Sequence, residues 1–379
     1  MPYRHLPFLP ELNNQGLPGQ LLYQQSDSVS EPQMPRLFFS ERLAELQDWI
    51  KHLCRMGEID HASGNHIAWS ISVSSCLQYQ AMFERMEGYL ATVVLLPMEF
   101  EYSEYLNVFI QSCLQLQILT KKNGNFVMDV SLSVSTQLRD VTLDWTSFCQ
   151  LLDLICAKSR TAEFKAKLRF QAKEANERYT DYCNYVNALF DCCDRLVVLR
   201  VDLVYHKELT GKTSLEMALA DLDRLFANMR NNYLFESLEG YIVKTEYGIE
   251  RGIHFHLVLF FNGSARNGSS HIFHARQIGQ YWSEVITRGR GWYWNCNRDA
   301  KNYQKMGRLG VGLIHWSDTD LRNNLLEHVV GYVCKQDQCF RSLLLPRAKL
   351  IRRGQYPAIV NVKRGRPRML SQTDGVQVS

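Results

Sequence analysis

The spacing of hydrophobic residues divides the chain into parts of different character. Residues 1–36 mix Pro, Gln, Ser and Gly without hydrophobic periodicity, which predicts a flexible arm. Between residues 37 and 189, apolar residues recur at helical spacing, as in Leu43–Leu53 and Leu151–Ile155. We therefore expect a mainly helical N-terminal domain over 37–189, and its sequence contains no motif that indicates its role.

At Arg195 the pattern changes to continuous runs of β-branched and apolar residues, which are typical of strands. The predicted strands are 196–205, 240–247, 253–261 and 310–316. Helical spacing predicts helices over 214–229, 274–286 and 320–338. The order is β-α-β-β-α-β-α, for which an antiparallel sheet with helices on one face is the most economical architecture. The predicted fold class is α+β, with the helical region followed by a sheet domain over 190–345.

The composition favours a globular protein. Hydrophobic residues make up 46% of the chain and charged residues 22%, which excludes a disordered or fibrous chain. No apolar run approaches the ~20 residues of a membrane helix, and the first residues do not resemble a secretory signal. Eleven cysteines without a CxxC pair indicate reduced thiols rather than a disulfide framework. We expect a soluble cytoplasmic protein with no membrane partner.

The charge is unevenly distributed along the chain. Residues 341–379 contain nine Lys or Arg and one acidic residue, a net charge of +8, whereas residues 1–340 carry −4. A basic terminal segment on a mildly acidic body indicates a polyanionic partner, usually nucleic acid; a solvated tail without a ligand is the alternative. We predict a basic DNA-binding tail over 346–379. Its RGRPR segment resembles an AT-hook with affinity for duplex DNA, and its candidate contacts are Arg364, Arg366 and Arg368.

A His–Phe–His triplet at residues 254–256 is the first sign of chemistry. Alternate residues of a strand share a face, so His254 and His256 can reach one metal ion while Phe255 faces the other side. Glu246 lies on the preceding strand, across a tight turn, where it can add an oxygen ligand. Such a set with open positions suits a divalent ion that also holds a substrate phosphate. Two half-buried histidines with local hydrogen bonds are the alternative for the triplet alone.

The last predicted helix carries Tyr332 and Lys335, which share a face because they are three residues apart. A phenol is a poor nucleophile at its free pKa of ~10, and a nearby ammonium or a metal-polarised phosphate makes it useful. Taken alone, the pair is better explained as a packed tyrosine and a surface lysine of an amphipathic helix. Its occurrence together with the histidine triplet, in this order and on these elements, favours a catalytic site.

Together these residues resemble the HUH superfamily of single-strand endonucleases. Within it, the chain is similar to the gene-two-type rolling-circle replication initiators of filamentous phages (inoviruses) and related prophage proteins. The resemblance covers roughly residues 160–368, through LRVDL, the RG that follows Glu246, HFHLVLF, GQYW, NCN and YVCKQDQ. It implies an antiparallel-sheet nuclease domain of the RRM/ferredoxin-like type. Residues 1–159 have no counterpart in this resemblance.

The resemblance also implies a mechanism and partners. Mg²⁺ or Mn²⁺ held by His254, His256 and Glu246 would polarise the scissile phosphate. Tyr332 would attack it, leaving a 5′-phosphotyrosine and a free 3′-OH, while Lys335 would steady the phosphate charge or lower the tyrosine pKa. The implied partners are single-stranded origin DNA and the host replication machinery, helicase and polymerase, in the cytoplasm of a bacterial cell.

Several further residues belong to this hypothesis. Tyr303 is a second candidate nucleophile, ranked behind Tyr332 because no lysine follows it at the same spacing on a helix. Asp202, inside LRVDL, is either structural or a support at the edge of the site. The aromatic cluster GWYWNCN follows two arginines and can stack unpaired bases, although an aromatic mini-core explains it equally well. Its candidate DNA contacts are Arg288, Arg290, Trp292 and Trp294.

Two other functions compete with the endonuclease. A non-catalytic DNA-binding prophage regulator would keep the fold and the basic tail, but it would not need Tyr332 together with the two histidines. A metal-dependent hydrolase that activates water through HxH would have no use for the Tyr-x-x-Lys helix, and it would normally want a third strong ligand. The combined motifs therefore favour the endonuclease.

Overall fold

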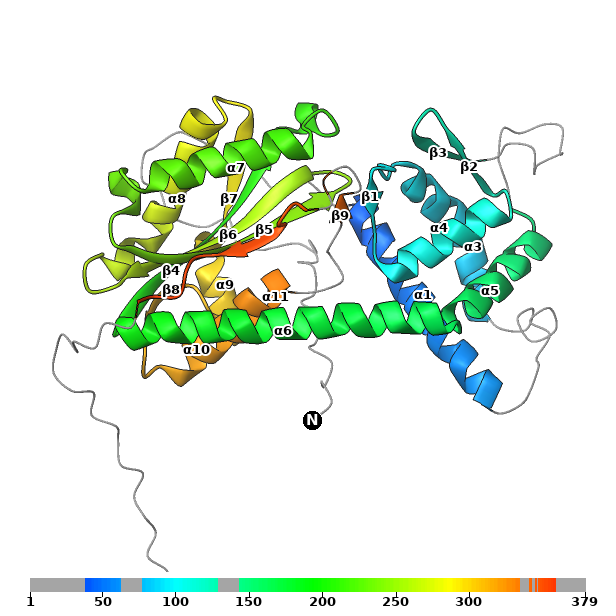
Figure 1. Ribbon diagram of the computed structural model, residues 1–379, viewed down its shortest axis with the longest axis horizontal. Coiled ribbons are helices and arrows are strands. Elements are labelled where there is room, and N and C mark those ends of the chain that lie inside the picture. Colours follow the sequence, from blue (N-terminus) through cyan, green and yellow to red (C-terminus); the bar gives the residue numbers. More distant parts are fainter. Residues whose placement is uncertain are drawn as a thin grey trace, which may run out of the picture. The chain divides into compact units, whose positions relative to one another are not determined.

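The computed structural model describes residues 38–62, 77–128, 143–334, 341–342, 345 and 347–358. Over these residues the protein combines helices with antiparallel sheet, and the mainly helical part precedes the large sheet (Figure 1). The α+β class predicted from the hydrophobic pattern is thereby confirmed. The predicted arm over 1–36, Lys335 and the arginines of RGRPR lie outside the described residues.

Helices dominate the described part of residues 38–192. They are α1 (Phe38–Ala62), α3 (Leu77–Val94), α4 (Glu104–Gln115), α5 (Trp145–Ser159) and α6 (Ala162–Cys192). Three of them begin at a side chain that accepts a hydrogen bond from a backbone N–H three residues on, namely Ser103, Asp144 and Thr161. Their apolar faces meet in a core that includes the fully buried Ile50, Phe109 and Leu152.

The same part of the chain contains short strands that the hydrophobic pattern did not predict. β2 (Leu119–Lys122) and β3 (Asn125–Met128) form a hairpin. Its turn residues Asn123 and Gly124 have φ values of 49° and 75°, the left-handed conformation that favours an Asn-Gly turn. A second short pair joins β1 (Phe100–Glu101) to β9 (Arg341–Ser342).

The large sheet is antiparallel, with the strand order β10-β5-β6-β4-β7 and with β8 also paired to β4. Its strands are β4 (Arg195–Tyr205), β5 (Leu238–Gly248), β6 (Gly252–Asn262), β7 (Gly291–Asn295), β8 (Gly312–His315) and β10 (Ile351–Arg353). The predicted strands correspond to β4, β5, β6 and β8. β7 was not predicted, and β10 lies within the segment that we assigned to the basic tail.

Helices cover both faces of this sheet, whereas we predicted helices on one face (Figure 1). The helices concerned are α7 (Leu215–Met229), α8 (His271–Tyr281), α9 (Ala300–Lys305), α10 (Thr319–Asn324), the π-helical segment η8 (Leu325–Val330) and α11 (Gly331–Cys334). α7 and α8 pack on the face that carries Leu199 and Phe255. α6, η8 and α11 pack on the opposite face, against Val198, Val258 and Phe260. The prediction of helices on one face was wrong because β4 and β6 are apolar and buried on both faces. Each face of the sheet must therefore pack against helices.

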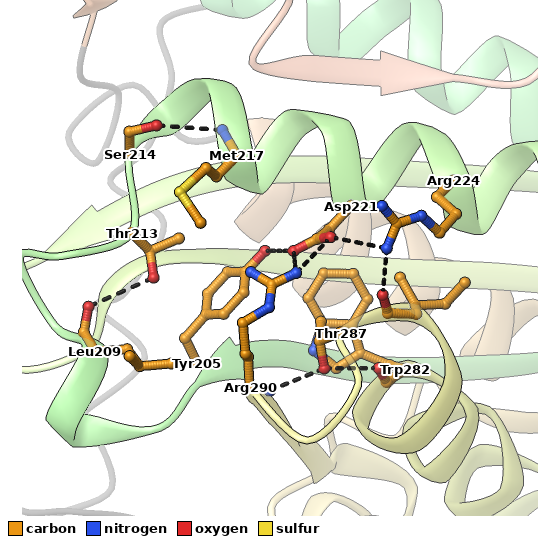
Figure 2. Close-up of polar contacts among 12 residues, drawn as sticks. Tyr205, Leu209, Thr213, Ser214, Met217, Asp221, Arg224, Trp282, Thr287 and Arg290 are labelled. Carbon is orange, nitrogen blue, oxygen red and sulfur yellow. Dashed lines mark hydrogen bonds and ion pairs between the residues drawn. The ribbon is translucent and has the colours of Figure 1, made fainter.

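A buried carboxylate ties α7 to the segment that leads into β7 (Figure 2). Asp221 is 2% exposed and accepts hydrogen bonds from Tyr205 Oη at 2.9 Å and from Arg290 Nη2 at 2.8 Å. Arg224 donates to the carbonyl of Ile286 at 2.7 Å. Arg290, a candidate DNA contact, is therefore held by Asp221 on the α7 side of the sheet.

Candidate metal centre

Three buried side chains meet on the sheet face that packs against α6 and α11. In the β5–β6 pairing, Glu246 lies directly opposite His254, and His256 lies opposite Lys244. On its other side, His256 lies opposite Asp202 of β4. Glu246, His254 and His256 are only 5%, 4% and 1% exposed, and their ligand atoms lie within 4.8 Å of one another. This group could bind a metal ion.

The hydrogen bonds of the two imidazoles suit metal ligation. His254 Nδ1 lies 3.0 Å from the carbonyl oxygen of Gly252, which can only accept, so Nδ1 carries the proton and Nε2 keeps its lone pair. His256 Nδ1 lies 2.7 Å from Asp202 Oδ1, and its Nε2 lies 2.9 Å from Glu246 Oε2. In each imidazole, Nδ1 is thus hydrogen-bonded to a protein oxygen, and Nε2 faces the Glu246 carboxylate. Metal-binding histidines usually have this arrangement, in which the oxygen partner fixes tautomer and orientation.

The charges around the group keep both carboxylates ionised. Burial would raise the pKa of Glu246, but the Lys244 ammonium and His256 hold it well below its usual range. Lys244 Nζ is buried and lies 2.6 Å from Glu246 Oε1. Burial would also raise the pKa of Asp202, and His256 and Arg200 lower it instead.

The two imidazoles respond to these surroundings in opposite directions. Burial lowers the pKa of His254, which keeps that ring neutral. Burial also disfavours the charged form of His256, but the neighbouring Asp202 and Glu246 carboxylates outweigh it and raise its pKa above 6.5. His256 is therefore the group that must release a proton before it can bind a metal ion.

Helix α11 brings Tyr332 to this group. The ring centroids of Tyr332 and His256 are 5.2 Å apart, and the guanidinium carbon of Arg200 lies 4.5 Å from the Tyr332 ring centroid. The ring is half-buried. Burial and the Glu246 charge raise the pKa of Tyr332, and Arg200 opposes them, so the phenol is protonated at neutral pH. The structure thus brings together Tyr332 and all three predicted ligands.

The remaining predicted residues, other than Arg290, occupy different positions around the metal-binding group. Tyr303 interacts with Arg200 and Asp202, and burial raises its pKa. Trp294 lies opposite Asp202 in the β4–β7 pairing, so the half-buried Trp292 and Trp294 are on the sheet face of the metal-binding group. Arg288 is exposed in the turn before β7, at a φ of 52°.

Arg200 and Lys244 were not among the predicted site residues. The sequence contains a signal for both, because each is a charged residue two positions from a carboxylate in an otherwise apolar strand, as in LRVDL and IVKTEY. Alternate positions share a sheet face, so each such pair places opposite charges on one face. Asp202, which we expected to be structural or supporting, holds His256 by hydrogen bond.

Comparison with protein-family models, curated proteins and solved structures gave no match to this chain. Within the described ranges, none of the helices combines the length and apolar character needed to cross a membrane.

Proposed function

We propose that this protein is a single-strand DNA endonuclease of the HUH type, with a nuclease domain of the RRM/ferredoxin-like kind. It would act as a rolling-circle replication initiator similar to those of filamentous phages and their prophages. The observation that carries the proposal is the position of Tyr332, whose ring contacts His256 beside Glu246 and His254. A helix far along the chain thereby presents a potential nucleophile to a potential metal site.

In this proposal Glu246, His254 and His256 hold Mg²⁺ or Mn²⁺, which when bound would polarise the scissile phosphate as a Lewis acid. Tyr332 Oη forms a bond to phosphorus while the bond from phosphorus to the 3′ oxygen breaks. The phenol loses its proton and the 3′ oxygen gains one, so no water is consumed. Because the phosphodiester energy stays in the phosphotyrosine, the reverse reaction can rejoin the strand.

The charges of the chain's own side chains support this reaction. The carboxylates of Asp202 and Glu246 are balanced by the cations of Arg200 and Lys244. With neutral imidazoles, the site therefore carries only the charge of its bound cation. Two positive charges match one phosphodiester and one phenolate, the charges that meet when the bond forms. We assign Lys335 the further role of steadying the phosphate.

The substrate class in this proposal is single-stranded origin DNA. Trp292 and Trp294, on the same sheet face, would stack unpaired bases next to the cleaved phosphate. The basic tail over 346–379 would add duplex affinity through Arg364, Arg366 and Arg368. The free 3′-OH would then serve the host helicase and polymerase.

The experiment is a search for a covalent adduct. The full chain is incubated with Mn²⁺ and a pool of single-stranded origin DNA labelled at the 3′ end, because a 5′-phosphotyrosine retains the 3′ fragment. We expect a denaturation-resistant adduct that maps by mass spectrometry to the segment around Gly331–Lys335. Tyr332→Phe keeps the ring contacts and should lose both nick and adduct while still binding DNA. Tyr303→Phe is the matched control, because that ring also neighbours Arg200.

The remaining outcomes separate the competing functions. An adduct on Tyr303 would keep the mechanism but change the nucleophile. Metal-dependent cleavage without any adduct, unaffected by Tyr332→Phe, would identify a hydrolase that activates water. DNA binding without cleavage in any metal would identify a non-catalytic regulator.

A further inference from the structure

Arg200 has a largely buried guanidinium whose Nε donor is unused within the described part of the chain. Its side chain is 15% exposed, and its Nε is fully buried with no hydrogen-bond partner. The nearest carboxylate oxygen, Asp202 Oδ1, is 3.7 Å from Nε and already accepts from His256 Nδ1 at 2.7 Å. Arg200 thus has a charge partner, but among the described residues its buried Nε has no hydrogen-bond acceptor.

Unused donors at a buried cation are costly, because a desolvated polar group without a hydrogen bond is destabilising. Arg322 is an example, in the same sheet domain, of an arginine beside a ring whose nitrogens do have acceptors. Its guanidinium carbon lies 5.0 Å from the Phe190 ring centroid, while its nitrogens donate to Trp316 O at 2.7 Å and Asn187 Oδ1 at 2.9 Å. Arg276 and Arg352 also have a buried Nε without an acceptor, so the feature that sets Arg200 apart is its position against Tyr332, beside the metal-binding group. This position indicates a ligand as its acceptor.

The surroundings of Arg200 favour an anion as that ligand. The guanidinium lies against the ring of Tyr332 and interacts with Tyr303. Of the nearby carboxylates, Asp202 is engaged by His256, and Glu246 is neutralised by Lys244 at 2.6 Å. A guanidinium fork matches two oxygens of a phosphate, which an ammonium cannot do with the same geometry.

We propose that Arg200 binds a phosphate group beside Tyr332, through its guanidinium donors. The identification of that group as the scissile phosphodiester rests on the proposed function. The anion site itself does not, because it consists of residues that need no metal. Arg200 then holds the non-bridging oxygens while Tyr332 approaches phosphorus.

The first arm of the test measures phosphate binding without metal. The full chain in EDTA is titrated with inorganic phosphate against sodium chloride of equal ionic strength, and binding is followed by calorimetry and by the rise in Tm. We expect Arg200→Gln to weaken phosphate binding about 10- to 100-fold, as the loss of charge-assisted hydrogen bonds requires. The phosphate affinity of Arg200→Lys should lie between those of native protein and Arg200→Gln, since lysine keeps the charge but loses the planar pair of donors. Arg322→Lys should lower Tm without changing phosphate affinity.

The second arm measures nicking in Mn²⁺. We expect Arg200→Lys to reduce kcat more than it raises KM, because the fork is used most fully when the phosphate carries extra charge. If native protein binds no phosphate, or if Arg200→Gln binds it as tightly as native protein, the proposal is overturned. Should Arg200→Gln fail to fold, the phosphate affinity of Arg200→Lys decides. Failure of the endonuclease proposal would be seen separately, because native protein would then form no covalent adduct with DNA. The phosphate titration in EDTA would still show whether Arg200 binds an anion.

Discussion

The hydrogen bond between Asp202 and His256 provides a sharp test of the metal centre. In Asp202→Asn, an amide of the same shape replaces the carboxylate that accepts the hydrogen bond from His256 Nδ1–H. If the amide oxygen faces the imidazole, a charge-assisted bond of 2.7 Å becomes a neutral one. If the amide nitrogen faces it instead, the proton moves to Nε2, the atom that would have to bind the metal. Both orientations weaken metal binding.

The size of the effect follows from the burial of the pair. Asp202 is 3% exposed and His256 1%, so water cannot replace the missing partner. A hydrogen bond to a charged group contributes about 1.5–3 kcal/mol, or roughly 10- to 150-fold in an equilibrium constant. Loss of an outer partner of a ligating histidine typically costs about 10- to 100-fold in metal affinity. We therefore expect Mn²⁺ to bind Asp202→Asn about 10- to 100-fold more weakly.

The assay is calorimetric titration of the full chain with Mn²⁺, with Tm recorded for each variant. Asp221→Asn is the matched control, because Asp221 is equally buried at 2% exposure but is bound by Tyr205 and arginines on the opposite face. It should lower Tm and leave Mn²⁺ affinity unchanged. The reasoning is refuted if Asp202→Asn binds Mn²⁺ like native protein, or if both variants lose affinity equally.

Two further predictions concern pH and the tail. Because the pKa of His256 is raised from its ordinary value of 6.5, the protonated form contributes stability below that value, and this stability is lost as pH rises through the raised pKa. A metal ion must displace the same proton. Mn²⁺ affinity should therefore increase up to about tenfold per pH unit below the raised pKa, where calorimetry should show about one proton released per ion, and should level off above it, where no proton is released. A flat profile would contradict this. Removal of residues 359–379 deletes a net charge of +3 while keeping β10, and it should reduce the log–log salt slope of single-strand DNA binding, by roughly 0.7 for each phosphate that the shortened chain no longer neutralises. An unchanged slope would show that this segment does not bind DNA.

The sequence predicted the parts of the fold that depend on local pattern. Continuous apolar runs identified β4, β5 and β6, because buried strands need such runs wherever they lie in a sheet. The strand β7 was missed, because its Trp-Tyr-Trp sequence becomes a strand only through pairing with β4. There Tyr293 packs with the α8 side while its two neighbours face the other way. That alternation is invisible without the partner strand.

The residues of the candidate site likewise divide into those that local spacing predicts and those that only the three-dimensional fold brings together. Glu246, His254 and His256 belong to one hairpin, so their common face follows from the two-residue period of strands. Arg200 could not be placed, because its proximity depends on β4 lying beside β6, a long-range strand order that local spacing does not contain. The approach of Tyr332 likewise depends on how the last helices cross the sheet.

The π-helical segment η8 determines the direction in which Tyr332 points. A π-helix bonds residue i to i+5 where an α-helix uses i+4, so one turn holds about one extra residue and every later side chain is rotated by roughly 100°. η8 ends at Val330, directly before α11 and Tyr332. Val329 and Val330 remain in the core, so the extra residue is accommodated without exposing apolar surface. In evolutionary terms, η8 resembles a one-residue insertion in an ordinary helix, and such an insertion changes the direction of every side chain that follows it, including that of Tyr332 beside His256.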